Sequence, residues 1–68
     1  MYDIEETIEL AEEIKDLTEE IPEEGIDLAC GITKSVEGIV SNIEAYGNVT
    51  DRQWDALENM KAGVEKWL

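Results

Sequence analysis

A chain of 68 residues is long enough for one small domain, and its formal charge of −13 is large for that length. A surface this negative repels DNA, RNA and anionic lipid, so its natural partners are cations or basic protein surfaces. The sequence has no histidine and a single cysteine, which excludes histidine-based catalysis, an internal disulfide and a cysteine zinc cluster. No apolar run approaches the ~20 residues that a membrane-spanning helix needs.

The negative charge is concentrated at the start of the chain. Residues 1–27 contain twelve aspartates and glutamates and one lysine, whereas residues 28–68 contain six acids and four bases. Acid-rich segments are usually disordered, but isoleucine and leucine recur in this one at helical spacing. The beginning of the chain is therefore expected to be an ordered helix with an acidic side.

The first predicted helix covers residues 3–20. Asp3 is a suitable N-cap, and Glu6, three residues later, would complete a capping box. Pro22 ends the helix near Glu20, because proline lacks an N–H and disfavours helical geometry in the residue before it. The predicted apolar face comprises Ile4, Ile8, Leu10, Ala11, Ile14, Leu17 and Ile21.

The second predicted helix covers residues 23–46. Pro22 suits the first position of this helix, where its missing N–H costs nothing. Gly47 would end the helix in the left-handed conformation that glycine adopts readily. The predicted apolar face comprises Ile32, Val36, Ile39, Val40, Ile43 and Tyr46.

Another row along the second helix has only small side chains, at spacings of four, three and four residues. Each glycine inside a helix costs about 1 kcal/mol, which suggests that another backbone packs closely against this row. The row is the predicted seam of a homo-oligomer, and the alternative is a break in the helix near Gly31. The row comprises Gly31, Ser35, Gly38 and Asn42.

Cys30 lies among apolar neighbours, and we predict that it is a small buried side chain. The alternatives are an intermolecular disulfide and a reactive thiol.

The third predicted helix covers residues 51–67 and has the clearest start signal in the chain. Thr50 is the expected N-cap, Gln53 closes the capping box, and Val49 and Trp54 are placed as a hydrophobic staple. The predicted apolar face comprises Trp54, Leu57, Met60, Val64 and Leu68.

Connections of two to four residues between amphipathic helices imply antiparallel neighbours. We therefore predict a single all-α domain over residues 1–68, a small three-helix bundle, with a helical homodimer as the alternative arrangement. We expect no catalytic, cofactor or metal site and hence no enzyme, because paired carboxylates on an open face share one wet environment and their pKa values do not diverge.

The acidic side of the first helix carries an energetic cost. Nine like-charged pairs three or four residues apart within residues 3–20 destabilise the helix by about 2–4 kcal/mol at low salt. A face that served only solubility would mix lysine with glutamate, so a function for the negative field is the better explanation. The predicted partner-binding residues are Glu5, Glu9, Glu12, Glu13, Asp16, Glu19, Glu20, Glu23, Glu24 and Asp27.

Carboxylates that recur every three or four residues along a helix repeat about every 5–6 Å, an interval comparable to that between nucleic-acid phosphates. In size, charge and helical character the chain resembles the small acidic proteins of bacteriophages, some of which mimic DNA and inhibit host defence enzymes, including anti-CRISPR and anti-restriction proteins. The segment YGNVTDRQWDALENM, residues 46–60, also looks like a helix start common in small phage proteins.

This resemblance implies a DNA-mimic inhibitor that occupies the basic surface of a nucleic-acid-binding host protein, without binding nucleic acid or membrane itself. The alternatives are a structural or assembly protein that forms helical homo-oligomers, and an acidic adaptor for a basic partner such as a transcription factor. The opening MYDIEE has neither the basic nor the apolar region of a secretory signal. We therefore expect a cytoplasmic protein, in the host cytoplasm if a phage encodes it.

Overall fold

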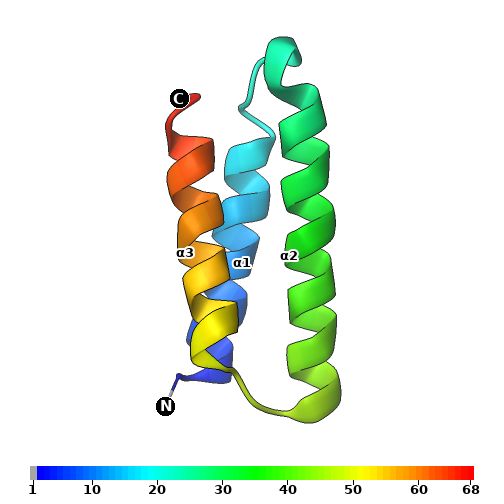
Figure 1. The fold of residues 1–68 in the computed structure, drawn as a ribbon, viewed down its shortest axis with the longest axis vertical. Helices are drawn as coiled ribbons and strands as arrows, with labels where there is room; N and C mark the ends of the chain where they lie inside the picture. Colours follow the sequence, from blue (N-terminus) through cyan, green and yellow to red (C-terminus); the bar gives the residue numbers. More distant parts are fainter. Residues whose placement is uncertain (1) are drawn as a thin grey trace.

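The computed structural model describes residues 2–68, which form a bundle of three helices, each antiparallel to the next along the chain (Figure 1). The elements are α1 (Ile4–Thr18), a 3-10 turn η1 (Glu23–Gly25), α2 (Ile26–Tyr46) and α3 (Asp51–Glu65). No strand occurs within these described residues, so the predicted all-α class and three-helix bundle are confirmed. The bundle measures 36 × 17 × 16 Å.

Helix α1 begins as predicted and ends earlier. The Asp3 carboxylate accepts a hydrogen bond of 2.8 Å from the Glu5 N–H, which satisfies one of the free N–H groups of the first turn. The reciprocal bond expected from Glu6 is not formed. After Thr18 the chain tightens, and the Ile21 N–H bonds to the carbonyl three residues back. The helix therefore ends at Thr18 and not near residue 20.

The connection between α1 and α2 differs from its prediction. Pro22, expected at the first position of the second helix, is extended (φ −67°, ψ 166°) and precedes η1, so α2 begins at Ile26 and not at residue 23. The break near Gly31, which was the alternative to a close backbone contact, does not occur, because α2 is continuous to Tyr46. Gly47 ends the helix with φ 72°, as predicted, and its N–H bonds to the Ile43 carbonyl at 2.7 Å.

Helix α3 carries the predicted capping box. The Gln53 N–H donates to Thr50 Oγ1 at 3.1 Å, and the Thr50 N–H donates to Gln53 Oε1 at 2.9 Å. The helix ends at Glu65, two residues before its predicted end. Trp54 has a partner that helix spacing did not indicate, since its ring stacks on Tyr2 with centroids 5.0 Å apart and planes within 7° of parallel.

The buried face of α1 includes two residues that the apolar pattern missed. Thr7 and Thr18 are buried beside Ala11 and Ile14. Both threonines satisfy their hydroxyls within the helix: Thr7 Oγ1 donates to the Asp3 carbonyl at 2.7 Å, and Thr18 Oγ1 donates to the Lys15 carbonyl at 2.6 Å. A buried hydroxyl with an internal partner costs little, so threonine serves as a core residue in this helix.

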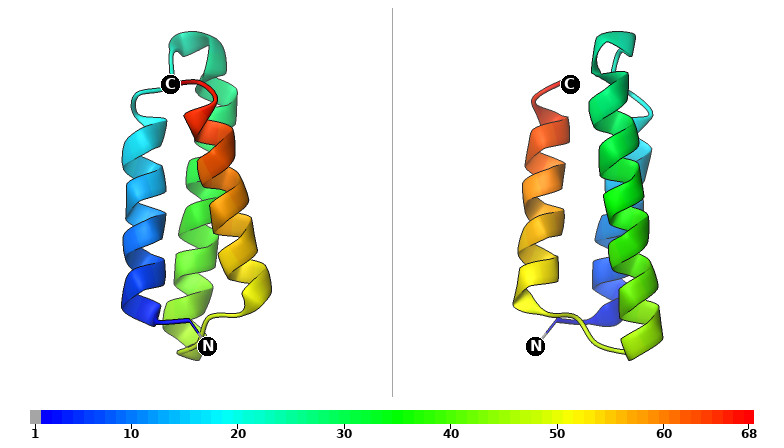
Figure 2. Two further views of the ribbon diagram at one scale, coloured as in Figure 1. Left: turned by 90° about the vertical axis from the view of Figure 1, so that its left-hand side faces the viewer. Right: turned by 45° about the vertical axis from the view of Figure 1, so that its right-hand side comes forward.

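The three helices contribute to one apolar core, which contains nine buried hydrophobic side chains. Because α1 packs against both other helices, while α2 and α3 pack less closely on each other, α1 is the shared partner. Figure 2 shows the three helices from two further sides. The core residues are Ala11, Ile14, Ile21, Ala29, Ile32, Val36, Ile43, Leu57 and Val64.

Three residues predicted to be in apolar faces or buried are exposed. Cys30 is exposed because it directly follows buried Ala29, and one helical step of 100° turns it away from the core. Tyr46 is 77% exposed at the last residue of α2, and Leu68 is 58% exposed beyond the end of α3. Helix ends project past the packed layer, so periodicity overestimates burial there.

Two glycines provide a matched test of the packing. A Cβ at buried Gly25 would lie 2.6 Å from Ile21 Cγ2 and 3.3 Å from the Trp67 ring, whereas a Cβ at Gly38 would meet nothing within 4 Å. We expect Gly25→Ala to lower the free energy of unfolding by about 1–3 kcal/mol through overpacking. We expect Gly38→Ala to raise it by about 0.4–1 kcal/mol. Urea unfolding followed by circular dichroism measures both, and a Gly25→Ala protein as stable as wild type would contradict the packing described.

Candidate interaction surface

The ten predicted partner-binding carboxylates, from Glu5 to Asp27, are all exposed, and we call them the acidic surface. Helix α1 places five of them on the side opposite its buried residues, because the core takes every third or fourth position and the acids fall between. Because the inner side of α1 packs against both neighbouring helices, the backbone positions of these five acidic residues are fixed relative to the bundle. Those five are Glu5, Glu9, Glu12, Glu13 and Asp16.

The acidic surface is not one straight row. Glu19 and Glu20 lie in the turn after α1, and Glu23 and Glu24 lie in η1. Asp27 lies in the first turn of α2, so the last three acids occupy the end of the bundle where α1 and α2 join (Figure 1). The surface therefore runs along α1 and continues over one end of the molecule.

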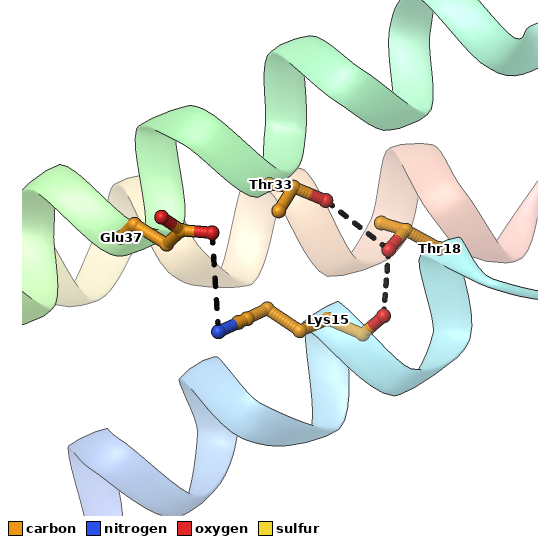
Figure 3. Close-up of polar contacts among 4 residues, drawn as sticks. All are labelled: Lys15, Thr18, Thr33 and Glu37. Atoms are coloured by element: carbon orange, nitrogen blue, oxygen red, sulfur yellow. Dashed lines mark hydrogen bonds and ion pairs between the residues drawn. The ribbon is translucent and has the colours of Figure 1, made fainter.

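Two lysines connect α1 to its neighbours. Lys61 Nζ of α3 lies 3.0 Å from Glu13 Oε1 of α1, and Lys15 Nζ of α1 lies 4.0 Å from Glu37 Oε1 of α2. Figure 3 shows the second pair beside the contact between Thr18 and Thr33, whose hydroxyl oxygens are 3.3 Å apart. Within residues 2–68, Glu13 is the one member of the acidic surface in an ion pair.

The ion pair with Glu13 raises the pKa of Lys61. The hydrogen bond to the Glu13 carboxylate and then the charge of that carboxylate raise the pKa of Lys61 above 10.5. Folding therefore stabilises the ammonium form of Lys61 relative to its neutral amine.

A shallow groove lies between α1 and α2, and sequence reasoning did not identify it. Glu37 and Glu44 of α2 belong to the groove, although both lie outside the acid-rich beginning of the chain. The signal that could have located it is antiparallel pairing, which sets Lys15 opposite Glu37 and Ile8 opposite Glu44. The groove is lined by Ile8, Ala11, Glu12, Lys15, Glu37, Val40, Ser41 and Glu44.

The small-residue row of α2 faces away from the core. All four residues, Gly31 to Asn42, are exposed, and a Cβ at either glycine of the row would have open space around it. The close backbone contact that the row suggested therefore does not occur among residues 2–68. Its use as an oligomer seam stays a prediction.

No group of three or more His, Cys, Asp or Glu side chains in residues 2–68 converges so that it could hold a metal ion. None of the helices over these residues has both the length and the apolar character needed to cross a membrane. The chain matches no known protein family, no curated protein and no solved structure. The acidic surface, the groove and the small-residue row of α2 therefore provide the evidence on function.

The Lys61 ion pair has a pH dependence that can be measured. Since folding raises the pKa of this lysine, the resulting stabilisation is complete below the unfolded value of about 10.5 and is lost as pH rises through the folded value. We expect Lys61→Gln to lower the free energy of unfolding at pH 7 and 9 more than Lys66→Gln, which removes the same charge from the exposed end of α3. The two variants should converge above the folded pKa of Lys61. Urea unfolding over a pH series from 7 upward through the titration of Lys61 tests this, and equal losses at pH 7 would contradict it.

Proposed function

We propose that this protein is a non-enzymatic binding protein whose acidic surface occupies the basic surface of a nucleic-acid-binding protein, as a DNA-mimic inhibitor of the anti-CRISPR or anti-restriction kind. The observation that carries the proposal is that all ten carboxylates are exposed and a single one is in an ion pair within residues 2–68. An anionic array with so few counter-charges of its own is available to a cationic partner.

The cost of the array supports a function for it. Six of the nine like-charged pairs lie wholly within α1, so repulsion in the folded helix costs about 1–3 kcal/mol at low salt. A domain of this size has a stability of only several kcal/mol. The chain places lysines where they bridge helices, at residues 15 and 61, and leaves the outer side of α1 without bases. Repulsion of that size would be relieved by contact with a basic surface.

The geometry of α1 supports the comparison with nucleic acid. Glu9 and Asp16 are seven residues apart on the same side of the helix, which corresponds to about 10.5 Å, with Glu12 and Glu13 between them. Carboxylates at such intervals match a groove whose lysines and arginines contact successive phosphates. Displacement of the counterions bound to both surfaces would then favour binding at low salt.

The proposal predicts competition with DNA. The immobilised protein should capture a DNA- or RNA-binding protein from a host lysate at low salt, and duplex DNA should displace it. The logarithm of the affinity should fall steeply and linearly with the logarithm of salt concentration, because several ion contacts are lost together. Binding that is insensitive to salt, or a captured partner that DNA does not displace, would contradict the mimic mechanism.

A pair of variants separates the acidic surface from net charge. One variant neutralises Glu5, Glu9, Asp16 and Glu20 to their amides, and the other neutralises Asp51, Asp55, Glu58 and Glu65 of α3. Both lose four negative charges at exposed positions. We expect the first to weaken capture at least tenfold and the second to weaken it much less, whereas equal weakening would show that net charge alone is responsible.

One observation favours a second function, that of a structural homo-oligomer. The exposed small-residue row of α2 would allow a helix of a second copy to approach closely, and the two glycines have room for it. An acidic adaptor for a basic partner that does not bind nucleic acid is a third proposal. In the lysate experiment it would appear as a salt-sensitive partner that DNA does not displace.

The oligomer alternative predicts a change in mass. Gly38→Leu leaves a single folded chain undisturbed, because nothing lies within 4 Å of a Cβ at this position. If the row is a seam, the wild-type protein sediments as a dimer at high concentration and Gly38→Leu sediments as a monomer. Lys34→Leu, an exposed position outside the row, is the matched control. An unchanged mass for Gly38→Leu rules out the seam.

A further inference from the structure

The groove between α1 and α2 combines an apolar floor with a charged rim. Ala11 is fully buried, and Ile8 and Val40 are partly buried at its base. Exposed Glu12 and Glu44 stand on opposite helices at its rim. The cavity measures about 170 Å³, well below the ~300 Å³ at which small-molecule sites begin. Its size suits one side chain of a partner better than a whole ligand.

The hollow follows from the side chains that face each other across the helix pair. Ala11 on α1 and Ser41 on α2 are both small, so the helices leave space where larger residues would fill it. The ion pair of Lys15 and Glu37, drawn in Figure 3, involves two of the residues that line the groove. At 4.0 Å and with both side chains about half exposed, this pair is weak and does not neutralise the rim.

The charge of the groove selects its occupant. Three carboxylates, those of Glu12, Glu37 and Glu44, face a single ammonium, that of Lys15. A long basic side chain can lay its methylene groups on an apolar floor while its charged end stays among acids at the rim. Arginine fits better than lysine, because its planar guanidinium is less strongly hydrated and can bond to two carboxylate oxygens together.

We propose that this groove receives an arginine side chain from the basic surface of the partner. The inference rests on the proposed function and adds Glu37 and Glu44 of α2 to the surface that contacts the partner. Arginine is one of the residue types that are enriched at the hot spots of protein interfaces. The remaining acids then provide the long-range field, and the groove provides the specific contact.

Nuclear magnetic resonance titration with a blocked hexa-arginine peptide tests the groove, with hexa-lysine as the matched probe. At low salt we expect the largest amide shift changes at Ala11, Lys15, Val40 and Ser41, and an affinity for hexa-arginine several times that for hexa-lysine. Shift changes centred on Glu9 and Asp16, or equal affinities for both peptides, would overturn the proposal.

Variants of the protein separate the contribution of the groove to peptide binding from that of net charge. Ser41→Leu fills the groove at an exposed position without changing any charge, and we expect it to abolish the preference for hexa-arginine. Glu12→Gln with Glu44→Gln should weaken hexa-arginine binding about tenfold, which corresponds to ~1.4 kcal/mol. Glu9→Gln with Asp16→Asn, which removes equal charge outside the groove, should weaken it about twofold.

Equal losses of hexa-arginine affinity in the two double variants, or unchanged peptide binding in Ser41→Leu, would overturn the proposal of an arginine site in the groove. Neither result would contradict the proposed role of the acidic surface. Failure of the proposed function is a separate result, because it appears as lysate capture that does not respond to salt or to DNA. The two proposals can therefore fail independently.

Discussion

The packing of α1 against both other helices is the constraint on which the rest of this structure depends. Its inner side alternates small and medium residues, from Thr7 to Thr18, and these let two neighbours approach at once. A chain of this length buries little surface, and the core positions of α1 together stabilise two interfaces, one with each neighbouring helix. The outer side of the same helix is not part of the core, and the exposed carboxylates of α1 lie there.

Repulsion and burial are therefore balanced within one element. The like-charged side chains on α1 favour separation, and the shared core opposes it, with Lys61 and Lys15 adding contacts to α3 and α2. A mobile acidic tail would carry the same charge with no cost to folding, but it would lose conformational entropy on binding. In a packed helix the electrostatic repulsion lowers the stability of the fold, but the carboxylates are already ordered before a partner binds.

Local motifs could be predicted from the sequence, because a few neighbouring residues determine them. Asp3, Thr50 and Gly47 act as caps regardless of what packs around them, and the three-helix architecture follows from their spacing. Burial of Thr18 and exposure of Cys30 depend on how each helix is rotated toward its neighbours, and composition does not encode that rotation. The groove was missed for the same reason: it exists only where two helices pass with small residues between them. The acidic surface was located because long, charged side chains avoid burial in any arrangement.

The uneven distribution of charge has a consequence for how the molecule meets other molecules. The carboxylates gather along α1 and at one end of the bundle, while the outer row of α2 from Gly31 to Asn42 has no ionisable side chain. Such a particle has a permanent electric moment, and near a cationic object it turns before contact so that its negative side leads. Productive collisions then become more frequent than random orientation allows, and the benefit falls as mobile ions shorten the reach of the field. The rate of encounter is thus shaped by the asymmetry of the fold, in addition to the strength of the final complex.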